Sequence, residues 1–362
     1  MKQLLFFFAF IINTLYLHSQ PTDYNKIENW DDICFCSMNN AFHPQTIVNA
    51  DNNWQLLLAM KSGLTLKELD SLKIPYTRSQ WLLLRSQRLI ERNQDVYKTS
   101  IPILDKEQTV ALRQQSHMAA KIVASEIEEE CKELVAFLSK NNRSQNVFSI
   151  LFSYVIDGLI WDRFEKDGII KEQPSGDGIW SGNYWFLTPK RSFSCGTNSI
   201  SNGDKYTFIL NWSESEKLTN EIPELDDFLI SLENEDKITD KKIIDEFSPF
   251  GFFDENSNLI IPVIDERENS DLCLISNKIT DKLLAAFVKA VDIETVKTLY
   301  KFRDNSETVL IFYHEMMWDI IDLLLDKKII QLPVVFQSPE TAKMTDIADL
   351  CFITLRHDKT HF

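Results

Sequence analysis

An internal repeat constrains the fold of this chain more than any other feature of the sequence. The segment IPILDKE begins at Ile101, and the similar segment IPVIDER begins at Ile261, 160 positions later. The same offset aligns ILFSYVIDGLIWDRFEKDGII, which begins at Ile150, with LIFYHEMMWDIIDLLLDKKII, which begins at Leu310. Two separated blocks that share one offset are typical of an internal duplication. We therefore expect two copies of one structural unit.

Each copy has the pattern of a helix-rich unit, in which residue spacing predicts helices and alternation predicts strands. Short helices come first, followed by a strand pair, two longer helices and a terminal β-hairpin, so the expected fold class is helix-predominant α+β. In the second copy, PVVFQ and LCFITLRH are expected to form that hairpin. We divide the chain into a signal peptide, a loop-rich arm, the first repeat, an acidic connector and the second repeat, at 1–20, 21–53, 54–212, 213–225 and 226–362. Separate domains and one intertwined unit are both open.

The stretch from Trp54 to Leu104 has the clearest local signals. One helix is expected to end at Gly63, a second begins with a capping box of Thr65 and Glu68, and a third begins at Ser79. The extended segment VYKTSIPIL follows. This order resembles the winged helix-turn-helix of regulators of the ArsR or MarR type, over about 50 residues and by pattern alone. The resemblance implies that each copy is winged-helix-like.

The first twenty residues have the order of a secretory signal peptide. Lys2 is their only charge, an apolar run extends from Leu4 to Leu17, and Ser19 and Gln20 follow. The apolar run is short for a membrane span. Its ending resembles the export signals of Bacteroidetes-type bacteria. We expect cleavage and a periplasmic or extracellular mature protein. The alternatives are an uncleaved membrane anchor or a buried strand.

Net charge limits the possible partners, and the cysteine content limits the possible disulfides. Without Lys2 the chain has 37 basic and 54 acidic residues, a net charge near −17, which opposes non-specific binding to nucleic acid or anionic lipid. The six cysteines are expected either as buried thiols or as one to three disulfides. The chain contains Cys34, Cys36, Cys131, Cys195, Cys273 and Cys351.

A predicted helix over 78–92 carries arginine on one face and apolar residues on the other. The basic face is expected to hold Arg78, Arg85, Arg88 and Arg92, with Trp81 among them. The apolar face is expected to hold Leu82, Leu83, Leu89 and Ile90. In a winged helix this is the recognition helix, and arginine suits phosphates and guanine edges. The alternative is a basic face that is solvated or that pairs with the acidic remainder of the protein, and the export signal, the net charge and the different second copy favour it.

Glycine and aromatic residues gather between Gly158 and Trp212. The segments NYWFLTP and KYTFILNW alternate as strands do and predict a hairpin. Exposed aromatic rings on such a hairpin would stack on sugars or hold a peptide, whereas buried rings would form the core. The candidate ligand-binding residues are Trp180, Tyr184, Trp185, Tyr206 and Trp212.

Catalytic and metal-binding motifs are absent from the sequence. The segment HEMMWD begins at His314, but a zinc protease motif needs a second histidine at position 318, which is Trp. His357 and His361 have helical spacing but lie beside the chain end, where fraying is the default. No nucleophile motif or phosphate-binding glycine loop occurs. We therefore predict no catalytic residue, no metal site and no cofactor.

Together these features predict an exported, non-catalytic binding protein with a protein, peptide or glycan partner. Two alternatives stay open. The first is a winged-helix transcriptional regulator that binds DNA through the arginine row. The second is a hydrolase without a recognisable motif.

Overall fold

A computed structural model describes most of the chain after residue 43. The described residues are 44–171, 191, 193, 195–203, 205–213, 216–235, 237–266 and 271–355, together with the backbone of β1 (Asp32–Cys34) and β6 (Tyr184–Phe186). Helices account for 60% and strands for 13%, which confirms a helix-predominant α+β fold. Within these ranges no helix is long and apolar enough to cross a membrane.

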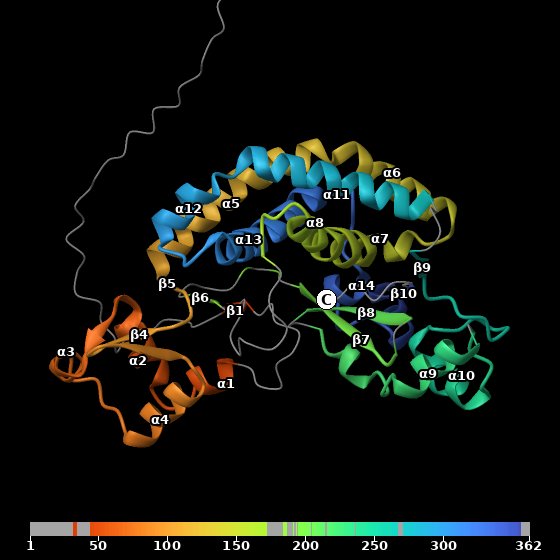
Figure 1. The fold of residues 1–362 in the computed structure, drawn as a ribbon. Coiled ribbons are helices and arrows are strands. Elements are labelled where there is room, and N and C mark those ends of the chain that lie inside the picture. The colour runs from red at the N-terminus through yellow and green to blue at the C-terminus, as the bar shows by residue number, and fades with distance from the viewer. Residues whose placement is uncertain are drawn as a thin grey trace, which may run out of the picture.

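Residues 44–104 form a small unit with its own core. Its elements are α1 (Pro44–Val48), α2 (Asn53–Ala59), η1 (Met60–Ser62), β2 (Leu64–Thr65), α3 (Leu66–Ser71), α4 (Arg78–Ser86), β3 (Ile90–Asn93) and β4 (Val96–Thr99). The three strands form an antiparallel sheet in the order β2-β4-β3. Leu56, Leu69 and Leu84 are fully or almost fully buried in one apolar cluster. Figure 1 shows this unit in orange, beside the rest of the chain.

Local signals explain where the helices of this unit begin and end. The capping box of Thr65 and Glu68 is present at the start of α3. Gly63 has a φ of +88°, which ends the preceding helix as expected. The third helix begins earlier than predicted: Thr77, not Ser79, is its N-cap, and it forms a second capping box with Gln80. Part of the expected loop-rich arm, residues 44–48, is helical.

The remaining helices are longer and form most of the chain. In the first half they are α5 (Lys106–Glu126), α6 (Glu128–Lys140), η2 (Ser144–Asn146), α7 (Val147–Ser149), η3 (Ile150–Leu159) and α8 (Ile160–Lys166), after strand β5 (Ile103–Leu104). In the second half they are η4 (Leu218–Glu221), α9 (Asp226–Glu235), α10 (Lys241–Phe247), η5 (Ser248–Phe250), α11 (Asp271–Ala290), α12 (Ile293–Tyr300), α13 (Asn305–Asp326), α14 (Val334–Gln337) and η6 (Met344–Leu350).

Two helices depart from the regular pattern. The amphipathic sequence from Lys106 to Lys140 is typical of one long helix, but the helix is broken at Ile127, which is the C-cap of α5 and the N-cap of α6. The ten residues of η3 form a π-helix inside an otherwise α-helical segment. A Cβ added to Gly158 would lie 2.6 Å from the carbonyl oxygen of Ser153. The wider turn therefore requires glycine at this position.

A four-stranded sheet joins segments from both halves of the chain. Its order is β7-β8-β10-β9, with β7 (Cys195–Ser201), β8 (Tyr206–Ser213), β9 (Val263–Asp265) and β10 (Cys351–Leu355). Strand β10 is antiparallel to β8 and parallel to β9. The terminal hairpin expected from PVVFQ and LCFITLRH does not form, because PVVFQ forms α14 instead of a strand and β10 pairs with β8 and β9. Pro333 precedes this helix with extended backbone, and Val335 and Phe336 are buried. A smaller sheet has the order β1-β6-β5.

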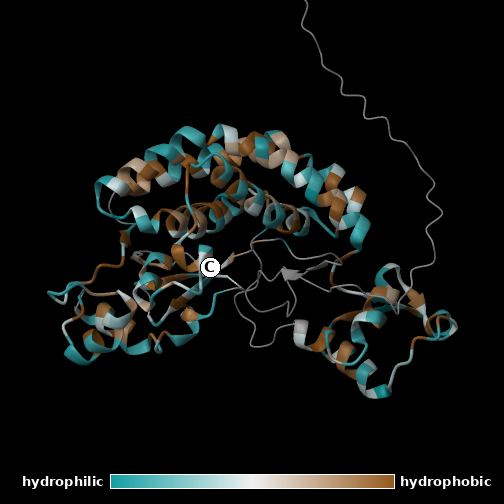
Figure 2. Ribbon diagram, turned by 180° about the vertical axis from the view of Figure 1, so that it is seen from behind, coloured by the Kyte–Doolittle hydropathy of each residue, from teal (hydrophilic) through white to brown (hydrophobic). Residues whose placement is uncertain are grey.

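The body, residues 104–355, has one core. A single apolar cluster extends from Leu104 to Leu355, so the expected connector at 213–225 does not separate two cores. The expected copies, 54–212 and 226–362, do not form separate domains, because α5 packs against α13, α11 packs against α8, and β8 pairs with β10. In Figure 1 the long helices arch over one face of the sheet, while α9 and α10 lie beyond it. Figure 2 shows these helices carrying both apolar and polar residues, as amphipathic helices do.

Candidate functional site

The exposed face of α4 combines two arginines with a leucine. Arg78, Leu82 and Arg85 are separated by four and three residues, so they share one side of the helix. Leu82 is 54% exposed, and both arginines are exposed. The opposite side is anchored: Leu84 is fully buried, and the Gln80 amide donates a hydrogen bond to Asn52 Oδ1 at 2.8 Å. Helix α4 therefore presents this face to solvent from a fixed position.

The arginine row predicted over 78–92 is only partly assembled, because α4 ends at Ser86. Arg88 follows the helix with a φ of +54°, and Arg92 lies on β3. The Arg92 guanidinium lies 3.2 Å from the Asp95 carboxylate and 5.5 Å from the centre of the Tyr97 ring. Two of the four predicted arginines thus share the helical face.

The apolar side of that prediction is wrong in two places. Leu82 and Leu83 were expected on the face opposite the arginines, but Leu82 lies between Arg78 and Arg85, and the two leucines are 54% and 37% exposed. Trp81 was expected on the basic face, but it is half-buried, with its ring 5.6 Å from that of Tyr76 and 4.8 Å from that of Tyr97. The cause is the early end of the helix. Because α4 ends at Ser86, the following turn places Leu89 and Ile90 in the core, and the side chains of residues 82 and 83 are not needed to fill it.

Charge is distributed unevenly along the chain. Residues 44–104 contain eight basic and five acidic residues, a net charge of +3. Residues 105–362 have a net charge of −17. The small unit is therefore a basic region on an acidic protein, and the α4 face belongs to it.

The aromatic segments do not form the expected hairpin with each other: β6, from NYWFLTP, pairs with β1 and β5, whereas β8, from KYTFILNW, pairs with β7 and β10. The described aromatic side chains of β8 are mostly buried. Tyr206 is only 4% exposed, and Phe208 is fully buried between Phe228 and Phe252. Strand β8 lies inside the sheet, between β7 and β10, and most of its side chains are buried. The aromatic platform expected from Tyr206 is therefore not on the surface.

Trp212 is the one exposed aromatic residue among the described candidates, at 37%. A Cβ at Gly196 would lie 2.5 Å from the Trp212 ring, so the ring packs flat over that glycine on β7. Tyr184 and Trp185 belong to β6, whose backbone alone is described, and Trp180 lies outside the described residues.

A buried ionic cluster connects α5 and α13 to Arg191. The Arg191 guanidinium donates to Glu315 Oε2 at 2.7 Å and to Asp319 Oδ1 at 2.9 Å. Arg113 Nε donates to the same Glu315 oxygen at 2.8 Å, and the Ser116 hydroxyl lies 2.6 Å from Asp319 Oδ2. The Glu315 side chain is completely buried. Two guanidinium groups thus balance two carboxylates. We name Arg113, Ser116, Arg191, Glu315 and Asp319 the ionic cluster.

Electrostatics in the ionic cluster favour the charged form of Arg191. Burial alone would lower the pKa of Arg191, but the carboxylates of Glu315 and Asp319 reverse this effect and raise the pKa above its usual value. The guanidinium also lies 5.5 Å from the centre of the Trp318 ring. The sequence signal was present but missed: acidic residues four apart on an otherwise apolar helix indicate a buried ionic contact. In the structure, the segment HEMMWD supplies both carboxylates of the ionic cluster, Glu315 and Asp319.

A second buried group of polar side chains lies where η3 meets the sheet. Asp157 accepts hydrogen bonds from the Thr197 hydroxyl at 2.8 Å and from Trp161 Nε1 at 3.3 Å. Burial raises the pKa of Asp157. The Ser153 hydroxyl lies 2.7 Å from the Thr197 hydroxyl and accepts from the Asn211 amide, so no base contacts it among the described residues. This arrangement can fix helix and sheet together, but it lacks the base that a serine nucleophile needs.

The cysteines of the body are buried thiols. Cys131, Cys195 and Cys351 form no disulfide, and burial raises the pKa of Cys131 to about 12. Such thiols are not reactive at neutral pH. Among the described residues, no group of three histidine, cysteine or acidic side chains is arranged to hold a metal ion.

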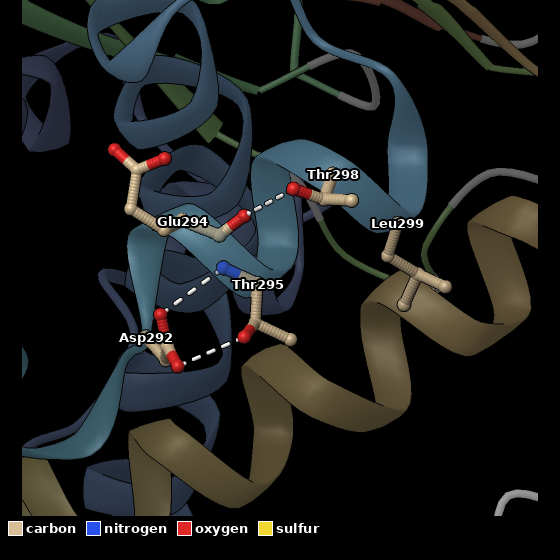
Figure 3. Close-up of a pocket in the computed structure, with 5 residues that line it drawn as sticks. All are labelled: Asp292, Glu294, Thr295, Thr298 and Leu299. Atoms are coloured by element: carbon tan, nitrogen blue, oxygen red, sulfur yellow. Dashed lines mark hydrogen bonds between the residues drawn. The ribbon is translucent and has the colours of Figure 1, made fainter.

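A shallow hollow lies at the start of α12, and Figure 3 shows the residues that line it. Asp292 caps the helix by accepting from the backbone and the hydroxyl of Thr295, at 3.0 and 2.8 Å. Thr298 donates to the carbonyl of Glu294 at 2.8 Å. The polar side chains that line the hollow form hydrogen bonds within their own helix, so helix capping accounts for their presence there.

Comparisons with protein-family models, curated proteins and solved structures gave no match to this chain. Among the described surfaces that combine exposed charge with exposed apolar area, the α4 face places Leu82, which is 54% exposed, between two exposed arginines.

Proposed function

We propose that the protein is an exported, non-catalytic binding protein whose small N-terminal unit carries the binding surface. The observation that carries this proposal is the α4 face, where Arg78 and Arg85 flank the exposed Leu82. Arginine and large apolar side chains are the residue types that contribute most to protein interfaces. The carboxylates of the ionic cluster and of Asp157 are instead bonded to side chains of the core.

The element order supports a winged-helix-like unit. Helix α2, strand β2, helices α3 and α4, and the β3–β4 hairpin follow one another as in a winged helix, and the sheet order β2-β4-β3 places the hairpin beside β2. In that motif the third helix is the one that contacts the ligand. Helix α4 has this position.

The element order also supports the proposed duplication. The series β5, α5, α6, η3 and α8 recurs about 160 residues later as β9, α11, α12 and α13. The halves exchange packing partners, because α5 contacts α13 while α8 contacts α11. Two copies that exchange helices in this way would form one intertwined body, which is one of the two arrangements that the repeat left open.

Export is tested by the N-terminus of the native protein. Mass spectrometry of the protein from separated cell fractions should find a chain that begins near Gln20, outside the cytoplasm. An intact Met1 in the cytosolic fraction would contradict export. The control is a cytosolic enzyme followed through the same fractions.

A second candidate function is binding to duplex DNA. The specific observation in its favour is the net charge of +3 on the small unit, with Arg78, Arg85 and Arg88 all exposed. The strongly acidic body opposes it. If the duplex is the ligand, replacing Arg85 and Arg88 by alanine should abolish binding, and the affinity of the native protein should fall steeply with added salt.

A further inference from the structure

We infer that the occupant of the α4 face is an acidic protein segment that also carries apolar side chains. This inference rests on the proposed function and names the partner class for the same surface. The face is defined by Arg78, Leu82 and Arg85, with Leu83 at its edge.

The spacing of the charges fits a carboxylate-bearing segment. Arg78 and Arg85 are seven residues apart, which places their Cα atoms about 10 Å apart along the helix. Guanidinium groups bind carboxylates through two parallel hydrogen bonds. Two acidic residues separated by one or two helical turns of a partner would reach both arginines at once.

The leucines separate a protein partner from a nucleic acid. Leu82 and Leu83 are 54% and 37% exposed, and they lie between and beside the arginines. Phosphate contacts would leave this apolar area facing charged oxygens and water. An amphipathic segment would instead bury it, as an apolar helix face does when it binds in a groove. Charge alone is compatible with both ligands, so the leucines decide between them.

The second half of the chain offers an internal comparison. Helix α10 follows α9 as α4 follows α3, and the repeat offset of 160 residues aligns Asp245 with Arg85 in the sequence. Its exposed side chains are mixed in sign, with Lys241 and Lys242 beside Asp245 and Glu246. Ile243 and Phe247 are buried. The basic and apolar combination therefore belongs to α4 and is not a general property of helices at this position.

The negative charge of the body would also orient an acidic partner as it approaches the protein. A negatively charged segment is repelled by residues 105–362, whose net charge is −17, and attracted by the unit of net charge +3. Long-range charge of this kind mainly raises the rate of encounter and excludes wrong orientations. An acidic partner is therefore guided to the small unit.

The test is a binding titration with the full-length mature protein. The probe is a fluorescent 16-residue amphipathic peptide built from glutamate and leucine. Three other probes accompany it: a glutamate–serine peptide, a lysine–leucine peptide and a DNA duplex of 16 base pairs. The variants are Arg85→Glu and Leu82→Ser, both at exposed positions. The matched control is Lys242→Glu, which makes the same change of charge on α10.

The glutamate–leucine peptide should bind the native protein, and Arg85→Glu should weaken it about tenfold, the loss expected for one charge-assisted contact. Leu82→Ser should weaken it about fivefold, and Lys242→Glu by less than about twofold, because an exposed charge away from the surface changes little. The glutamate–serine peptide should bind more weakly than the glutamate–leucine peptide.

Three outcomes would overturn the inference. Binding of the duplex that depends on Arg85 and not on Leu82 would assign the face to nucleic acid. Self-association that Arg85→Glu removes would assign it to a second copy of this chain. Failure of every probe, with the variants folded as judged by circular dichroism, would remove the acidic segment as occupant. Export, which is tested separately by the N-terminus, would still stand.

Discussion

Replacing Arg191 by methionine should destabilise the body of the protein. The substitution keeps most of the side-chain volume and removes the guanidinium that bonds Glu315 at 2.7 Å and Asp319 at 2.9 Å. Removing one partner of a buried ion pair costs about 3–5 kcal/mol, because the other charge is left without compensation. Arg113 and Ser116 still contact the two carboxylates, so we expect the lower end, about 3 kcal/mol.

Hydrogen–deuterium exchange with mass spectrometry is the appropriate assay for this loss. The chain has two apolar clusters, so one unfolding curve for the whole molecule would mix two units. The slowest amides of α13 report the global opening of the body alone. They should exchange about a hundredfold faster in Arg191→Met, since each 1.4 kcal/mol corresponds to about a factor of ten.

A double-mutant cycle with Glu315→Gln isolates the contact itself. Because Arg191 and Glu315 bond directly, the two losses should not add, and we expect a coupling free energy of about 2 kcal/mol. The control is Lys132→Met, which removes the exposed pairs with Glu128 and Glu129 and should leave the exchange of α13 unchanged. Additive losses, or an Arg191→Met exchange rate equal to that of the native protein, would refute the reasoning.

Three further predictions follow from single positions. Gly158→Ala should lower the stability of the body by about 2 kcal/mol, measured by the exchange of the slowest amides of α13, because the added Cβ meets the Ser153 carbonyl; a gain, which glycine-to-alanine changes in ordinary helices give, would contradict this. Thr77→Ala should speed exchange in α4, with a loss of about 1 kcal/mol, because the capping box with Gln80 is lost. Burial raises the pKa of Asp349 from 3.8 to about 6, so its protonated form favours folding, and this stabilisation is complete below pH 3.8 and lost as the pH rises through 6. Asp349→Asn should therefore equal the native protein in stability below pH 3.8 and exceed it by about 1 kcal/mol at pH 8, a value reduced because the side chain is partly exposed.

Local signals in the sequence predicted local structure well. The capping box of Thr65 and Glu68 and the helix end at Gly63 are present as expected. The helix-predominant fold class is confirmed as well. These features depend on interactions between residues that are close in the sequence, so they can be predicted from the sequence alone.

Long-range packing was not readable in the same way. The pairing of β10 with β8 joins residues about 145 positions apart, and the contact of Arg113 with Glu315 spans 202 positions. In neither pair does the local sequence of one segment indicate which distant segment it contacts. The helix break at Ile127 and the π-helix η3 have the same origin, because the packing of surrounding helices overrides local propensity there.

The candidate site shows the same limit of local pattern. Arg78 and Arg85 were correctly expected to share a helix face, since a spacing of seven residues places them there whatever the surroundings. The exposure of Leu82 was not expected, because an apolar residue in a helix is usually assigned to its buried face. Which face is buried depends on the position of the core, and here Gln80 and Leu84 occupy it.

The body and the small unit therefore have different physical roles. In the body, exchanged helices, a sheet drawn from both halves and the ionic cluster all bind the two halves together, so the halves cannot separate without exposing buried charge. The small unit has its own core, and it contacts the body through Lys61, whose ammonium lies 3.1 Å from the Asp105 carboxylate. Side chains on α4 can change without disturbing the core of the body. Variants of the ionic cluster should consequently lower stability and leave peptide affinity unchanged, whereas Arg85→Glu and Leu82→Ser should do the reverse.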